Sequence, residues 1–151
     1  MNWTVNLSLA AALLAASQAA LAGQLVTAEE VQASDNAAPV LVMQAAAPDP
    51  LAPVITLADL NALNKPLKNP FSMEISFKSQ AGAGLDLASF KAFYGTFKID
   101  ITDRLLKEAT KTLAGLKLAN VEVPAGRHKI LLRINDSQGR TAEKELAFRV
   151  E

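Results

Sequence analysis

The chain has 151 residues, with 15 basic and 15 acidic side chains, one histidine and no cysteine. This length accommodates one ordinary domain with a tail, or at most two small domains. The absence of cysteine excludes disulfide scaffolds, thiol catalysis and thiolate metal sites, and a single histidine excludes a multi-histidine metal centre.

The zero net charge hides an asymmetry along the chain. Residues 1–64 contain five acidic and no basic side chains, whereas residues 65–151 contain 15 basic and 10 acidic ones, a net charge of +5. The basic residues are spread over several segments and do not gather into a cluster. This modest excess suits a domain that touches an acidic surface, and it falls short of the footprint of a nucleic-acid-binding protein.

The first segment has the features of an export signal. Residues 1–28 carry no charged side chain, and an almost continuous apolar run ends in Ala20-Leu21-Ala22, the small-x-small pattern of a signal-peptidase site. The run is short for a membrane span, which needs about 20 apolar residues. No Lys or Arg precedes it, which is unusual for a signal. We predict that residues 1–22 are a signal peptide and that the protein is periplasmic or secreted; an uncleaved anchor or a buried helix is the alternative.

The composition of residues 23–53 is typical of a linker, rich in Ala, Gln, Asp and Pro. Three prolines within residues 48–53 prevent a helix and stiffen the chain toward polyproline II. The short run Val40-Leu41-Val42-Met43 is either a strand or a few apolar residues in a tail. We predict a disordered Ala/Pro-rich linker that acts as a spacer.

Residues 54–151 show the period-two alternation of short strands separated by turn signals. The predicted strands cover residues 73–78, 90–94, 97–101, 128–134 and 146–150. Residues 80–84 are expected to form a loop. Between the last two strands, Asp136 can cap a turn and Gly139 can adopt a positive φ.

One segment breaks the alternation. Residues 103–113 place leucine and alanine side chains at helical spacing, with Thr102 as a candidate N-cap and Gly115 as a candidate C-cap. We predict a short helix that leans on the sheet. The alternative is an irregular loop, followed by a strand from Leu113 onward.

The alternation and turn signals indicate about six or seven short strands in nearly a hundred residues, which favours an antiparallel sandwich. The run from Gly84 to Phe90, followed by Gly95 and Asp100-Ile101-Thr102, resembles the first half of bacterial immunoglobulin-like modules. The closing segments 124–128, 135–140 and 148–150 resemble their last hairpin. The resemblance covers roughly residues 70–151 and departs at the helical segment and at Arg140. The resemblance implies an immunoglobulin-like fold and specifies fold far better than function. Together with the alternation and the helical spacing, it predicts an all-β, immunoglobulin-like antiparallel sandwich over residues 54–151 with one short helical insertion.

The residue types that usually serve in catalysis or bind metals do not form a convincing catalytic or metal site in this sequence. By parity the single histidine, His128, faces the core and is expected to be structural. The acidic residues that could serve as paired catalytic carboxylates or calcium ligands lack the D-x-D spacing with which one loop wraps an ion; they are Asp86, Asp100, Asp103 and Asp136. Sugar binding usually needs exposed aromatic platforms, and the candidates outside the signal are Tyr94, Phe90 and Phe93. We therefore expect no enzyme, no cofactor and no metal site.

Two function classes survive. The first is a non-enzymatic exported module that binds or positions another envelope or secreted protein, with contact to the membrane only through an uncleaved signal. The second is an accessory module for carbohydrate or cell-wall material. For the first class, the predicted contact surface consists of basic residues on the closing hairpin that are expected to point away from the core: Lys129, Arg133, Lys144 and Arg149.

Overall fold

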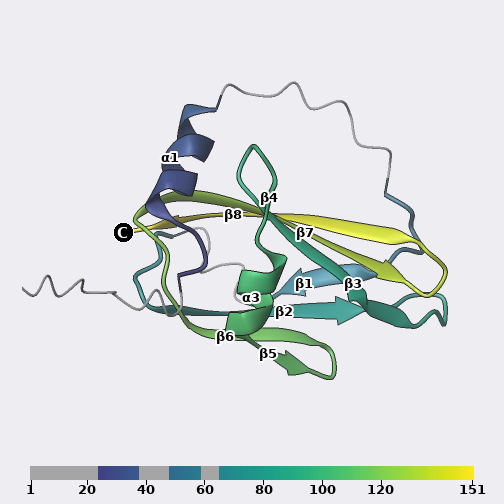
Figure 1. The fold of residues 1–151 in the computed structure, drawn as a ribbon. Coiled ribbons are helices and arrows are strands. Elements are labelled where there is room, and N and C mark those ends of the chain that lie inside the picture. The colour runs from purple at the N-terminus through teal and green to yellow at the C-terminus, as the bar shows by residue number, and fades with distance from the viewer. Residues whose placement is uncertain (1–23, 38–47, 59–64) are drawn as a thin grey trace, which may run out of the picture.

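A computed structural model describes residues 24–37, 48–58 and 65–151 (Figure 1). The predicted signal peptide and the run Val40–Met43 lie outside these residues. The elements, in chain order, are α1 (Ala28–Asn36), β1 (Val54–Leu57), β2 (Phe71–Lys78), β3 (Leu85–Tyr94), β4 (Ile99–Asp100), α3 (Thr102–Glu108), β5 (Ala109–Thr112), β6 (Gly115–Val121), β7 (Gly126–Asp136) and β8 (Thr141–Val150).

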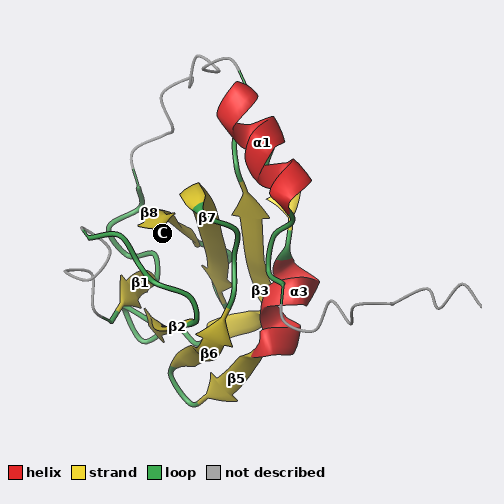
Figure 2. Ribbon diagram, turned by 90° about the vertical axis from the view of Figure 1, so that its left-hand side faces the viewer, coloured by secondary structure: helices red, strands yellow, loops and turns green. Residues whose placement is uncertain are grey.

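The strands form two antiparallel sheets, with the orders β1-β2-β6-β5 and β4-β3-β7-β8. The two sheets lie over each other, with β1 and β8 along one side and α3 and β5 along the other (Figure 2). The predicted all-β sandwich is therefore confirmed at the level of architecture. The longest pairing is the β7–β8 hairpin, whose register runs from Gly126 opposite Val150 to Asn135 opposite Thr141.

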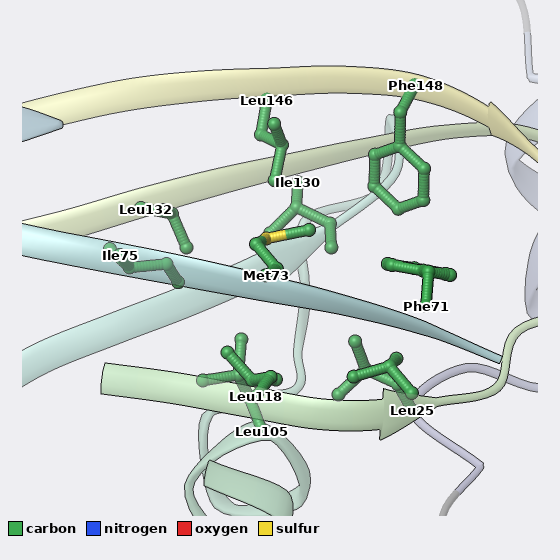
Figure 3. Close-up of a pocket in the computed structure, with 11 residues that line it drawn as sticks. Leu25, Phe71, Met73, Ile75, Leu105, Leu118, Ile130, Leu132, Leu146 and Phe148 are labelled. Atoms are coloured by element: carbon green, nitrogen blue, oxygen red, sulfur yellow. The ribbon is translucent and has the colours of Figure 1, made fainter. Parts of the chain in front are cut away.

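The core fills the space between the sheets, and the period-two pattern places its side chains there. His128, Ile130, Leu132 and Ile134 alternate inward along β7 and are buried, as predicted from their parity. Figure 3 shows side chains of both sheets meeting Leu105 of α3 around a small void. This void measures about 10 Å³ and has a wholly apolar lining, so it has room for no ligand.

The structure differs from the predicted linker over residues 24–37, which form helix α1 and the short segment before it. Thr27 and Glu30 make a reciprocal capping box, in which the Thr27 hydroxyl accepts from the Glu30 amide and the Glu30 carboxylate accepts from the Thr27 amide. Leu25, Val26 and Val31 are buried in the core. These side chains are buried against residues far along the chain from α1. A prediction of disorder that rests on local composition does not take such contacts into account.

Helix α1 rests on two glycines of the sandwich. A Cβ atom at Gly95 would lie 2.6 Å from the Ser34 hydroxyl, and one at Gly126 would lie 3.3 Å from a methyl of Val31. Both glycines also have positive φ, 66° and 144° respectively. A side chain at either position would obstruct the close approach of the helix.

An ion pair fixes the start of α1. The guanidinium of Arg104, on α3, donates to both carboxylate oxygens of Glu30 at 2.6 and 2.9 Å. The hydrogen bond from Arg104, together with the Thr27 amide, lowers the pKa of Glu30 despite the opposing effect of partial burial. One carboxylate thus caps its own helix and holds that helix to a second one.

The proline-rich segment is also structured where it is described. Asp49 accepts hydrogen bonds from the backbone amides of Leu51 and Ala52, which closes a turn. Ala52 is buried, and its carbonyl accepts from the Gln80 side chain. Residues 48–53 therefore lead directly into β1 and do not continue as an extended spacer.

The predicted helix over residues 103–113 is wrong in its second half. Helix α3 ends at Glu108, and β5 follows at once and pairs with β6 across a turn at Leu113 and Ala114. Ile101 occupies the N-cap without a side-chain hydrogen bond, so Thr102 is the first helical residue and not the cap. Gly115 begins β6 and does not cap the helix; a Cβ there would lie 1.9 Å from the Ile75 carbonyl oxygen on β2.

The strand predicted over residues 97–101 is shorter than expected. Only Ile99 and Asp100 pair with β3. Gly95 and Lys98 have positive φ and form a turn, at the tip of which Phe97 is 64% exposed. The left-handed backbone at Lys98 interrupts the alternation that the sequence suggests for Phe97.

Candidate interaction surfaces

Two of the four basic residues predicted as a contact surface already have acidic partners on the same face. Lys129 and Arg133 point outward from β7, as predicted. The Lys129 ammonium lies 3.1 Å from Glu145, and the Arg133 Nε donates to Glu143 at 2.7 Å. Pairs of this kind, exposed on neighbouring strands, neutralise each other and leave little net positive charge for a partner.

The predicted outward orientation of Lys144 is wrong. In the β7–β8 register it lies opposite Leu132, whose side chain is in the core, so Lys144 belongs to the inner face of β8. Its side chain is nevertheless exposed, because β8 is an edge strand. An inward-pointing lysine on an edge strand hinders pairing with a strand of another molecule. Lys144 thus lies at the edge of the sheet and not on its outer face.

Arg149, the fourth residue, lies directly opposite Arg127 on the outer face. Together with Gly126 and with Asp35 of α1, these two arginines line an open hollow of about 420 Å³. Within the described residues, no carboxylate lies within 4.0 Å of either guanidinium. Arg127 has the same parity as Lys129 and Arg133, so alternation alone could have identified it.

The single histidine forms part of a buried polar chain. The Pro124 carbonyl can only accept, so the Nε2–H of His128 donates to it, at 2.8 Å. The Nδ1 of a neutral His128 then accepts from the Tyr94 hydroxyl at 3.0 Å. Burial lowers the pKa of His128, although the Pro124 carbonyl and Asp35 act in the opposite direction. Burial, with a smaller contribution from Asp35, raises the pKa of Tyr94 to about 12.

This chain of hydrogen bonds is structural in its geometry. Tyr94 and His128 are both buried, and the imidazole stacks on Phe148 with ring centroids 5.2 Å apart. Each nitrogen of the ring has one partner, so the neutral form is fully satisfied. The histidine therefore holds the start of β7 to the end of β3 and is not presented to solvent.

The four aspartates considered as catalytic or calcium-binding residues do not come together. Within the part of the chain that the structure describes, no group of three or more potential metal ligands occurs. Asp136 is buried and accepts from the amides of Gln138 and Arg140 and from the Arg140 guanidinium, so it caps the β7–β8 turn as predicted. Gly139 in the same turn has a φ of 76°.

The aromatic candidates for a sugar platform are covered. Tyr94 and Phe90 are buried, and Phe93 is half-buried beneath the Arg133 guanidinium, 5.4 Å from its ring centroid. None of the three presents an open ring face to solvent. Among the described residues, the exposed aromatic ring is that of Phe97, for which a strand was predicted.

A second depression, which we call the β3–β5 groove, opens beside α3. It has a volume of about 230 Å³ and is lined by Phe77, Leu87, Ala88, Phe90, Leu106, Lys111, Gly115 and Leu116. Beside this lining, the Ala88 amide donates to the Asp86 carboxylate. The Ser89 hydroxyl donates to the Asp86 carbonyl and accepts from the Asn135 amide. These bonds give Asp86 and Ser89 a structural reason for their spacing in the segment 84–90.

No protein-family model, no curated protein and no solved structure matches this chain. Among residues 24–37, 48–58 and 65–151, no helix is long and apolar enough to cross a membrane.

Proposed function

We propose that this protein is an exported, non-enzymatic immunoglobulin-like module that binds another protein of the cell envelope. The immunoglobulin-like assignment is supported by the strand order. In constant-type immunoglobulin domains one sheet contains the first, second, fifth and fourth strands and the other the third, sixth and seventh. The orders β1-β2-β6-β5 and β3-β7-β8 agree with this arrangement, with β4 as an addition beside β3.

The observation that carries the binding role is the pair formed by Arg127 and Arg149. Like charges directly opposite each other on neighbouring strands destabilise a sheet. Here the two guanidinium groups line an open hollow, and among the described residues they have no carboxylate partner. A guanidinium presents a planar fork of donors that matches a carboxylate, and arginine is enriched in protein interfaces. An acidic segment of a partner protein would relieve the repulsion.

The test is affinity capture from envelope extract, with mass spectrometry as the readout. The wild-type chain is compared with the double variant Arg127→Glu, Arg149→Glu. The matched control is Lys78→Glu, Lys117→Glu, which makes the same change in charge at exposed positions of the opposite sheet. The proposal expects a protein that wild type and control capture and the arginine variant does not, with capture falling steeply as salt rises because exposed charges are screened over about 10 Å at 0.1 M.

Equal capture by all three chains would refute the assignment of this surface. Salt-insensitive retention on envelope polysaccharide, unaffected by either double variant, would instead favour the carbohydrate-binding alternative.

Export is a separate part of the proposal and has its own test. It is supported by the uncharged apolar segment and the Ala20-Leu21-Ala22 pattern. N-terminal sequencing of the protein recovered from its native host is expected to begin at Gly23. If the protein is recovered from a membrane fraction and its sequence begins at Met1, the first segment is an uncleaved anchor and not a cleaved signal peptide.

A further inference from the structure

The β3–β5 groove lies between the outer edge of β5 and the outer edge of β3 at residues 87–90. Within the described residues, β5 pairs only with β6. Among the described residues, β4 pairs with β3 only at Phe93 and Tyr94, so residues 87–90 have no strand beside them on that side, and of their amides that of Ala88 already donates to Asp86. Exposed strand edges of this kind bind extended peptides through main-chain hydrogen bonds.

The floor of the groove is apolar and its rim is accessible. Phe77, Phe90 and Leu116 are buried beneath it, whereas Leu87 at the rim is 51% exposed. Pockets for drug-sized ligands usually occupy about 300–1,000 Å³. A volume of about 230 Å³ with this lining is better suited to an anchoring apolar side chain than to a whole small molecule.

Among the described residues that line the groove, Lys111 is the only charged one. It lies opposite Leu116 in the β5–β6 register and therefore on the inner face of β5. No carboxylate of a described residue lies within 4.0 Å of its ammonium. The mouth of the groove thus combines an apolar cavity, a cation without an acidic partner in the described chain, and open strand edges.

We propose that the β3–β5 groove binds an extended segment of a partner protein, which inserts an apolar side chain into the cavity and places an aspartate or glutamate next to Lys111. This site shares no lining residue with the hollow at Arg127 and Arg149 and does not depend on it. A sugar is disfavoured as occupant because the aromatic rings of the groove form its floor and are buried.

The test uses the full 151-residue chain and a phage-displayed library of random linear peptides as the probe. Enriched peptides are synthesised, and their binding is followed by fluorescence polarisation and by amide shifts in NMR spectra. The variant Ala88→Trp fills the cavity, and Lys111→Glu reverses its charge. Their matched controls are Ala147→Trp, at an exposed position of β8, and Lys144→Glu, at the inward lysine of the other edge.

We expect enriched peptides with an apolar residue close to Asp or Glu, and amide shifts confined to residues 87–90 and β5. Ala88→Trp should weaken binding by about tenfold or more, the loss expected when one apolar side chain can no longer be buried. Lys111→Glu should weaken it several-fold and do so less at high salt. Both control variants should bind like wild type.

Three results would overturn the proposal: no enrichment, enriched peptides without acidic residues, or binding that the groove variants and their controls affect equally. A concentration-dependent dimer abolished by Ala88→Trp would assign the groove to a second copy of this chain instead. Thermal melts of each variant identify loss of folding, and the amide shifts of the wild-type chain locate the bound peptide independently of any substitution.

Discussion

The buried chain Tyr94–His128–Pro124 makes a specific prediction about stability. Tyr94→Phe removes the hydroxyl that donates to Nδ1 of His128 and leaves a buried acceptor without a partner, which costs about 1–3 kcal/mol. His128→Phe keeps an aromatic ring against Phe148 but leaves both the Tyr94 hydroxyl and the Pro124 carbonyl unsatisfied, so we expect a larger loss. The double variant removes hydroxyl and imidazole together and should be no less stable than His128→Phe alone.

The same network predicts a dependence on pH with a defined sign. Burial lowers the pKa of His128 in the folded protein, whereas in the unfolded chain it titrates near 6.5. As the pH falls below about 6.5 the unfolded chain takes up a proton that the folded protein does not, so the free energy of unfolding decreases. The stabilising effect of the neutral imidazole is complete above pH 6.5 and is lost from there toward the lower pKa of the folded state.

Urea denaturation at pH 7 and pH 5, for wild type, both single variants and the double variant, measures these effects. The cycle should give a coupling free energy of about 1 kcal/mol or more between residues 94 and 128. Wild type should lose stability between pH 7 and pH 5, and His128→Phe should lose less over the same interval, because it is the only histidine. A coupling near zero, or equal losses in the two proteins, would refute the assigned hydrogen bonds and the neutral imidazole.

Three further predictions concern packing. Gly95→Ala would bring a Cβ against Ser34, so hydrogen exchange should show less protection of the α1 amides and unchanged protection of the β7–β8 amides. If the α1 amides are protected as in wild type, α1 does not pack on Gly95. Truncation of Phe77 or Phe148 to Ala should cost about 3–5 kcal/mol each in denaturant melts, and losses under about 1 kcal/mol would place these rings outside the core. Gly115→Ala should destabilise far more than Gly84→Ala, whose Cβ would have only ordinary contacts; similar midpoints would contradict the close approach of β2 and β6.

Alternation is a reliable guide where a strand has one buried and one exposed face. It predicts the inward set of β7 and β8 and the burial of His128, and turn chemistry predicts the turn at Asp136 and Gly139, all as observed. The same rule places Lys144 inward with Leu146, so the outward orientation predicted for Lys144 was inconsistent with the alternation of its own strand. The pairing of Lys129 and Arg133 with glutamates depends on the exact register of the β7–β8 hairpin, and the sequence pattern does not determine that register to within one residue.

Features that depend on distant contacts were harder to predict. Helix α1 lies in an Ala-rich segment, and its local signal was the capping-box spacing of Thr27 and Glu30. The hydrogen-bond partners of Leu25, Glu30 and Ser34 in this segment lie 62 to 79 residues further along the chain. Similarly, α3 ends where the chain can pair with β6, although helical spacing continues to Leu113. In both cases tertiary packing overrides local propensity.

The packing of α1 on Gly95 and Gly126 constrains the order in which this chain can complete its fold. The helix leaves the ribosome first, but the second of its two glycines is about 90 residues behind it. At roughly 5–20 residues per second, between about 4 and 20 seconds of synthesis separate the helix from Gly126. During that interval the surface that buries Val31 is incomplete, because Gly126 of β7 has not yet been made. Docking of α1 is therefore a late step, which can occur only after β3 and β7 have met.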